Sequence, residues 1–276
     1  MAELRVCVSL ESTTVDEMVD EAARANLSGA DMVEIRFDRL WLDKPEPEIV
    51  EDENGRTREV MSLENTWAVN DLEHVEIEAA LDRLVEGIQA ETMFTIRATG
   101  GGGFFPGTEE QRLAILDAAT SRGIQWIDLE DGIDASTRET LVAKAREAGI
   151  SIVVSRHDAS TPGADDITTW IKDSSEHGDL VKFCSMISNP SDALQLVQAS
   201  MDLKDGDVKF SIMGLGPAEI GRAFTLQSWA RAWSTRPCGP NTPSRTKAGS
   251  TSATSAMLGS CSSTDHDSTG SRPAIA

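Results

Sequence analysis

The sequence predicts an α/β protein of the TIM (β/α)8 barrel type, in which the eighth strand is missing or aberrant. Short β-branched runs alternate with longer segments of helical period, which is the pattern of a parallel sheet covered by helices. The runs are apolar on both faces, and no glycine-rich phosphate loop follows the first of them, which favours a barrel over a doubly wound sheet. The length of 276 residues is close to the roughly 250 residues of one such barrel.

The individual elements follow from these two periods. Seven apolar runs predict strands at Leu4–Leu10, Met32–Phe37, Met93–Ala98, Trp126–Leu129, Ser151–Ser155, Leu180–Cys184 and Val208–Met213. Segments of helical period predict helices at Val15–Leu27, Glu76–Ile88, Glu109–Thr120, Thr137–Ala148, Asp165–Ser174 and Ser191–Met201. Thr108, and Asn189 or Ser191 beside Pro190, are suitable helix caps. The polar, acidic insertion Trp41–Asn70 is expected to be an exposed excursion between the second strand and its helix.

The last part of the chain breaks this pattern. All but two of the 46 Asp and Glu residues precede residue 220, whereas residues 234–276 are rich in Ser and Thr. We therefore predict a catalytic barrel domain at 1–233 and a disordered tail at 234–276, which has too few β-branched aliphatic residues to supply an eighth strand. Two interpretations stay open. The tail is natural, or the coding frame was lost near Phe224, since a GC-rich gene read out of frame yields such residues.

The charge balance restricts the partners. With 25 Lys and Arg against 46 Asp and Glu, the formal net charge of −21 argues against nucleic acid and membrane surfaces as partners. Such an acid excess suits a salt-rich cytosol, so a halophilic source is a hypothesis. The four cysteines are scattered, the four histidines show no metal-binding spacing, and no run of 18 apolar residues occurs. We expect a cytoplasmic protein without a bound metal.

Charged residues stand at the ends of the predicted strands, where barrel enzymes place their catalytic groups. Glu34 and Arg36 alternate along the second strand and therefore point to one face, either as a ligand-binding pair or as a structural buried ion pair. Arg97 ends the third strand before the run Gly100–Gly103, which indicates either a mobile turn or a close backbone approach. Glu130 ends the fourth strand and is either a ligand or a carboxylate paired with a neighbouring Arg.

His157 and Lys182 are the candidates for catalysis. His157 follows the fifth predicted strand, where a general acid or base would stand, although a lone His is more often structural. Lys182, one of only seven lysines, lies between Val181 and Phe183 in an apolar strand. Desolvation there would favour the neutral amine, which can attack a carbonyl carbon to form a Schiff base. The alternative is a lysine whose ammonium reaches solvent at the rim of the strand.

The ordered motifs resemble those of the type I 3-dehydroquinate dehydratases. They are Glu34-Ile35-Arg36-Phe37-Asp38, Arg97, Ser155-Arg156-His157-Asp158 and Lys182, on successive strands within a resemblance that extends from Val6 to Arg222. The resemblance implies dehydration of 3-dehydroquinate to 3-dehydroshikimate in the shikimate pathway, without metal or organic cofactor. Lys182 would form the Schiff base and His157 would transfer protons. The substrate-binding residues that the resemblance implies are Ser9, Glu34, Arg36, Arg97 and Arg222.

Three departures from the family pattern stand out. A Glu that would orient the histidine is replaced by Gly101, the stretch from Met213 to Arg222 is about one residue longer, and the eighth strand with its closing loop has no counterpart. The missing strand would leave the first and seventh strands with unpaired edges. Two other functions stay open, namely another Schiff-base barrel enzyme resembling class I aldolases, and an inactive homologue that only binds a small-molecule ligand. The sequence also leaves open whether two copies form a homodimer.

Overall fold

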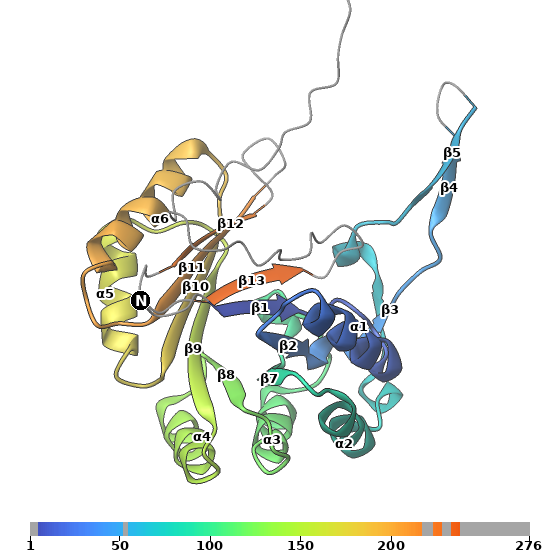
Figure 1. The fold of residues 1–276 in the computed structure, drawn as a ribbon, viewed down its shortest axis with the longest axis horizontal. Coiled ribbons are helices and arrows are strands. Elements are labelled where there is room, and N and C mark those ends of the chain that lie inside the picture. The colour runs from blue at the N-terminus through green and yellow to red at the C-terminus, as the bar shows by residue number, and fades with distance from the viewer. Residues whose placement is uncertain (1–4, 52–54, 217–222, 228–232, 238–276) are drawn as a thin grey trace, which may run out of the picture. The chain divides into compact units, whose positions relative to one another are not determined.

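The computed structural model describes residues 5–51, 55–216, 223–227 and 233–237, and its core is a parallel sheet (Figure 1). Seven parallel strands curl into a half-barrel, which confirms the predicted fold class. Their order in the sheet, from the seventh predicted strand to the first, is β11, β10, β9, β8, β7, β2 and β1. The bounds in chain order are β1 Arg5–Ser9, β2 Met32–Arg36, β7 Glu91–Thr95, β8 Trp126–Glu130, β9 Ser151–Asp158, β10 Leu180–Met186 and β11 Phe210–Leu215.

Six α-helices connect these strands and cover the outer face of the sheet (Figure 1). They are α1 Val15–Leu27, α2 Ile77–Gly87, α3 Glu109–Ala119, α4 Ala135–Glu147, α5 Ala164–Ser174 and α6 Pro190–Leu203. Their starts follow from local chemistry. Thr108 caps α3, and Asn189 rather than Ser191 caps α6, each in a reciprocal capping box, while Pro190 occupies the first turn, where no N–H is needed.

The interior of the half-barrel is built in two layers along the strands. The lower layer is apolar and buried, and it consists of Cys7, Met32, Met93, Val153 and Leu180. Because side chains alternate along a strand, the residue two positions further on faces the same interior, nearer the carboxyl end. These residues form a polar upper layer of Ser9, Glu34, Thr95, Ser155 and Lys182. The larger apolar core lies on the other face of the sheet, against the helices.

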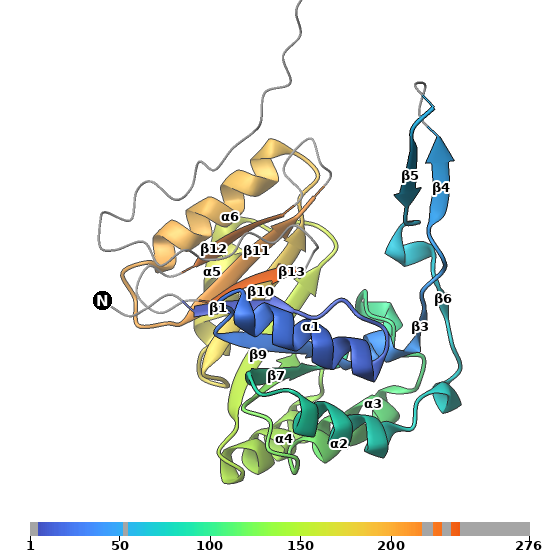
Figure 2. The ribbon, with the colours of Figure 1, turned by 45° about the vertical axis from the view of Figure 1, so that its right-hand side comes forward.

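The segment after β2 is an extension of the barrel (Figure 2). It begins with the 3-10 helix η1 Phe37–Trp41, and β3 Leu42–Asp43 then pairs with β6 Ala68–Val69 at its base. Further out, β4 Glu48–Glu51 and β5 Thr57–Val60 form an antiparallel hairpin whose described residues are mostly exposed. Two more 3-10 turns, η2 Glu64–Thr66 and η3 Leu72–His74, lead to α2. Most described residues of the predicted excursion Trp41–Asn70 are exposed, but its first two residues, Trp41 and Leu42, are buried.

Two further strands lie at the edges of the sheet. β12 Ala223–Gln227 pairs antiparallel with β11, and β13 Trp233–Pro237 pairs parallel with β1. An antiparallel strand beside the seventh parallel strand is aberrant for a (β/α)8 barrel, in line with the predicted fold class. Two expectations differ from this arrangement: the edges of β1 and β11 are paired, and residues 234–237 are part of a strand. Edge pairing uses backbone groups, so it does not require an apolar side-chain pattern. The other residues of the predicted tail, 238–276, lie outside the described residues.

Candidate active site

Lys182 lies inside the half-barrel, in the middle of β10, with 4% of its surface exposed. Its Nζ atom is 3.0 Å from Oε1 of Glu34 on β2 and 3.5 Å from Oδ2 of Asp128 on β8. Both carboxylates are buried. The lysine therefore does not extend its ammonium to solvent but holds it between two acidic side chains.

These two carboxylates decide the charge of the amine. Burial by itself lowers the pKa of Lys182, but the negative charges of Glu34 and Asp128 outweigh it and raise the pKa above its usual value. The prediction that desolvation yields a neutral amine is therefore wrong for the protein without ligand. The paired ammonium must lose a proton before the nitrogen can act as a nucleophile.

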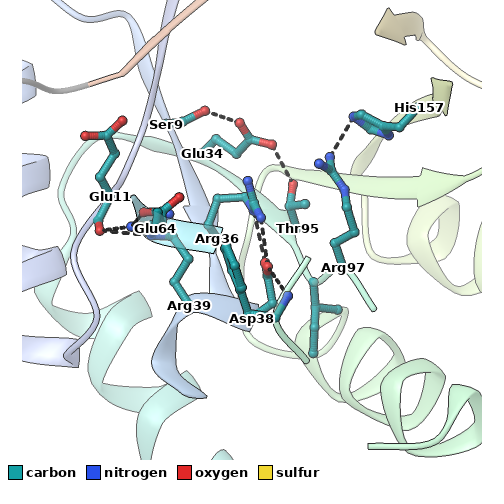
Figure 3. Close-up of polar contacts among 12 residues, drawn as sticks. Ser9, Glu11, Glu34, Arg36, Asp38, Arg39, Glu64, Thr95, Arg97 and His157 are labelled. Atoms are coloured by element: carbon teal, nitrogen blue, oxygen red, sulfur yellow. Dashed lines mark hydrogen bonds and ion pairs between the residues drawn. The ribbon is translucent and has the colours of Figure 1, made fainter. Parts of the chain in front are cut away.

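Glu34 is the centre of the hydrogen bonds in the upper layer (Figure 3). Its carboxylate accepts a hydrogen bond from the hydroxyl of Ser9 on β1, and its Oε1 accepts one from Oγ1 of Thr95 on β7 at 3.0 Å. Burial raises the pKa of Glu34, but the positive charges of Lys182 and Arg36 and the hydrogen bond from Ser9 outweigh this effect. The net pKa of Glu34 is well below its usual value. Glu34 is therefore ionised and fixed in orientation.

His157 and Arg97 form a second pair beside this cluster. Arg97 follows β7 and points its Nη2 at Nε2 of His157, at 2.7 Å (Figure 3). His157 stands on β9 two residues after Ser155, and Ser155 is the register partner of Lys182, so both site residues face the same side of the sheet. Burial, followed by the positive charges of Arg97 and Lys182, lowers the pKa of His157 well below its usual value. The imidazole is thus neutral near pH 7.

Glu130, at the end of β8, contacts both of these residues. Its Oε1 is 3.4 Å from Nε of Arg97 and 3.9 Å from Nδ1 of His157, and its Oε2 is 3.1 Å from Nη1 of Arg112 on α3. The prediction of a carboxylate paired with a neighbouring Arg is confirmed. Burial raises the pKa of Glu130, although Arg97 opposes this effect. A pocket of about 570 Å³, lined among others by Glu130, His157 and Ser155, opens here.

Arg36, at the end of β2, pairs with Asp38. It donates two hydrogen bonds to Asp38, from Nε at 3.0 Å and from Nη2 at 2.7 Å (Figure 3). Asp38 also accepts a hydrogen bond from the backbone N–H of Phe104 at 3.1 Å, which ties the end of the glycine-rich loop to η1. The hydrogen-bond partner of Arg36 is therefore Asp38 and not Glu34. Arg222, the last of the predicted substrate-binding residues, lies outside the described residues.

Several buried polar atoms in this region have no hydrogen-bond partner among the described residues. They are Oδ1 of Asp128, Nδ1 of His157, and the hydroxyls of Ser155 and Ser211, whose backbones flank Lys182 in the register of β9, β10 and β11. An unsatisfied buried polar group is costly and calls for an explanation, such as a ligand. Their concentration around one lysine indicates a site prepared for a small polar molecule.

Sequence reasoning missed two members of this cluster, Asp128 and Thr95. The signal for Asp128 was present, because Asp128 and Glu130 alternate along β8 just as Glu34 and Arg36 alternate along β2. Thr95 gave no such signal, since a threonine is an ordinary residue in a strand. The other predicted residues within the described part, from Ser9 to Lys182, do meet at the carboxyl ends of the strands.

Within the described ranges, no group of three or more His, Cys, Asp or Glu side chains could hold a metal ion. In the same ranges, no helix has both the length and the apolar content needed to cross a membrane.

Fold and site together define an α/β barrel protein whose candidate active site surrounds a buried amine at the carboxyl ends of the strands. The chain belongs to the type I 3-dehydroquinase family, because the sequence model of that family matches residues 6–227. This match covers the described strands from β2 to β12 and all of β1 except its first residue, Arg5.

Individual relatives agree with this assignment. The chain is 27% identical over 200 residues to a 3-dehydroquinate dehydratase of Desulfotalea psychrophila, covering 72% of each chain. It is also 27% identical over 233 residues to a 3-dehydroquinate dehydratase of Methanothermobacter thermautotrophicus, covering 82% of this chain and 88% of the other. Among solved structures, the type I 3-dehydroquinate dehydratase of Clostridium difficile has a TM-score of 0.63 at 19% identity and 85% coverage of both chains. That similarity shows the fold.

Proposed function

We propose that this protein removes water from 3-dehydroquinate to give 3-dehydroshikimate, through a Schiff base on Lys182. The observation that carries the proposal is the environment of the Lys182 amine. This amine is buried, held by Glu34 and Asp128, and surrounded by polar atoms that have no hydrogen-bond partner among the described residues. Membership of the type I 3-dehydroquinase family supports the same reaction.

The reaction begins at the lysine. Once Lys182 has given up its extra proton, its Nζ adds to the C3 carbonyl carbon of the substrate, and the carbonyl oxygen leaves as water. The resulting iminium withdraws electrons from the adjacent carbon, so the C2 proton becomes acidic. The low dielectric of the buried site strengthens this effect, because no bulk water screens the positive charge.

His157 moves the protons. In the protein without ligand, its Nε2 accepts a hydrogen bond from Arg97, so this nitrogen carries the lone pair of the ring that can take a proton. When the bound substrate takes over the Arg97 guanidinium, this lone pair is released, and Nε2 is the base that removes the C2 proton. The same proton then leaves with the C1 hydroxyl as water, and a double bond forms between C1 and C2. Hydrolysis of the imine consumes one water and releases 3-dehydroshikimate, so that the net change is the loss of one water.

The surrounding residues hold the substrate in place. Ser9 and Glu34 offer hydrogen-bonding groups in the upper layer, and Arg36 and Arg97 stand at its rim. Arg222 is proposed as the partner of the substrate carboxylate, because a guanidinium binds a carboxylate through two parallel hydrogen bonds. Holding a substrate in one orientation converts binding energy into rate.

Reductive trapping tests this function. Incubation with 3-dehydroquinate and borohydride, followed by peptide mass spectrometry, should show a covalent adduct on Lys182 and loss of activity. The variant Lys182→Ala should form no adduct, whereas Lys144→Ala, which removes an exposed lysine on α4, should behave like the unmodified chain. The absence of an adduct on Lys182 would refute the mechanism. A folded chain that binds the substrate without turnover would instead favour the inactive homologue.

A further inference from the structure

The protonation of His157 can be read from its contacts. Arg97 places Nη2 2.7 Å from Nε2 of the ring. A guanidinium only donates hydrogen bonds, so Nε2 must be the acceptor. In a neutral imidazole the proton then resides on Nδ1. Nδ1 is therefore a hydrogen-bond donor that points away from Arg97.

Within the described part of the chain, this donor lacks an acceptor at hydrogen-bond distance. Nδ1 of His157 is buried and has no hydrogen-bond partner among the residues that the structure describes. The carboxylate oxygen Oε1 of Glu130 is 3.9 Å from it. That separation is too long for a direct hydrogen bond. One bridging water, or a shift of the carboxylate oxygen by about 1 Å, would complete a hydrogen bond between Nδ1–H and Glu130.

Glu130 is held in a position to fill this role. Arg112, whose side chain is anchored by the backbone oxygen of Ile96 at 2.9 Å, lies 3.1 Å from Oε2 of Glu130. Oε1 is left to face Arg97 and His157. One oxygen thus fixes the carboxylate to α3, and the other is directed at the histidine.

Position 101 adjoins this carboxylate. A Cβ atom added at Gly101 would lie 3.6 Å from Oε1 of Glu130 and 3.6 Å from Cγ of Arg97. A side chain at position 101 would thus extend from beside the same oxygen, and an acidic one would repel Glu130. With glycine at position 101, Glu130 is the carboxylate that the described residues place against His157.

We propose that Glu130 is the positioning residue for His157, accepting the Nδ1 hydrogen directly or through one water. It would take the part that the family resemblance assigns to an acid at position 101. By holding Nδ1–H, Glu130 keeps the ring proton off Nε2, fixes the orientation of the ring and stabilises the imidazolium that forms when Nε2 takes the C2 proton. This inference rests on the proposed dehydratase function for its kinetic consequence, but not for the hydrogen bond itself.

The kinetic test compares two carboxylates that share Arg112. Glu130→Gln keeps the shape but removes the charge, and it should lower kcat roughly 10- to 100-fold with little change in KM, because a misplaced base costs about that much. Glu109→Gln is the matched control, since Glu109 binds Nε and Nη2 of Arg112 at 2.7 Å and belongs to an exposed helix start. It should leave kcat nearly unchanged.

A rescue variant completes the kinetic test. Adding Gly101→Glu to Glu130→Gln supplies a new carboxylate from a position whose Cβ lies 3.6 Å from Oε1 of Glu130, and it should restore a large part of the lost kcat. Equal activity of Glu130→Gln and the unmodified chain would overturn the proposal. So would an equal loss in Glu109→Gln, because the effect would then come through Arg112.

A magnetic resonance measurement separates this inference from the proposed function. In the chain labelled with 15N-histidine, the Nδ1 proton of His157 should resonate far downfield and exchange slowly with water. Glu130→Gln should move it upfield and speed the exchange, and Glu109→Gln should not. An unchanged resonance in Glu130→Gln would refute the hydrogen bond even if the chain is an active dehydratase. A changed resonance would support it even if no turnover is found.

Discussion

Lys182 keeps its proton because two acids from different strands approach the same amine. Glu34 comes from β2 and Asp128 from β8, and each is more than 50 residues away from Lys182 in the sequence. The sequence predicts burial of the lysine but not its partners, because the curvature of the sheet decides which strands face each other across the interior. Burial and ion pairing act on the pKa in opposite directions, so predicting burial alone leads to the wrong charge.

The contribution of Asp128 can be measured through pH dependence. Since Asp128 raises the pKa of Lys182, Asp128→Asn should lower it, and the neutral amine should be available at lower pH. The alkaline rise in the rate of imine trapping should therefore shift toward acid. Ser211→Ala, which removes only a neutral hydroxyl beside the lysine, is the control. A rise at the same pH in Asp128→Asn would show that Asp128 does not set this pKa.

At the scale of single elements, the glycine-rich loop after β7 shows what its sequence leaves undecided. A run of four glycines allows both a mobile turn and a close backbone approach, and the structure shows the second. The N–H of Gly103 donates to the oxygen of Ala98 at 2.9 Å, and a Cβ at Gly103 would lie 2.2 Å from the backbone oxygen of Arg97. The loop is thus packed directly against Arg97, which donates a hydrogen bond to His157.

Two alanine substitutions in this loop should differ sharply. Gly103→Ala should displace Arg97, lower kcat/KM at least about 10-fold, and destabilise the fold by roughly 1–3 kcal/mol through overpacking. Gly100→Ala meets no atom within 4 Å and should change neither activity nor melting temperature appreciably. Steady-state kinetics and thermal unfolding of both variants check this expectation. Similar behaviour of the two variants would contradict the close approach at Gly103.

Local chemistry is where sequence reasoning about elements succeeds. The expected helix Val15–Leu27 agrees with the structure at both ends, and the caps at Thr108 and Asn189 are present. Such starts depend on residues a few positions apart, so they are encoded locally. The pairing of Trp233–Pro237 with β1 joins segments more than 200 residues apart through backbone groups, and no side-chain pattern announces it.

At the scale of the whole molecule, the excess of acid is the dominant property. The formal charge of −21 is spread over a chain with 46 Asp and Glu residues, and carboxylates without a basic partner repel each other in the folded state. Screening by salt shortens the range of this repulsion from about 10 Å at 0.1 M to about 3 Å at 1 M. The halophilic hypothesis therefore has a thermodynamic consequence.

The melting temperature should rise with salt. Raising KCl from about 0.1 M to about 2 M should increase Tm by roughly 3–10 °C, which corresponds to about 1–3 kcal/mol for a chain of this size. A neutral osmolyte at the same osmolality leaves the repulsion in place and should have a smaller effect. Calorimetry in both series makes the comparison. A melting temperature that stays constant or falls with KCl would rule out charge repulsion as the limit on stability.

Mutations in the two layers of the barrel interior should give different growth phenotypes. A substitution in the lower layer, for instance at Met32 or Leu180, weakens packing beneath the reactive groups but leaves those groups in the molecules that still fold. A substitution at Glu34 or Lys182 removes a reactive group from molecules that fold. Alleles of the first kind should be temperature-sensitive, and alleles of the second kind should fail at every growth temperature. A plain genetic screen could thus map the boundary between the layers without any structure.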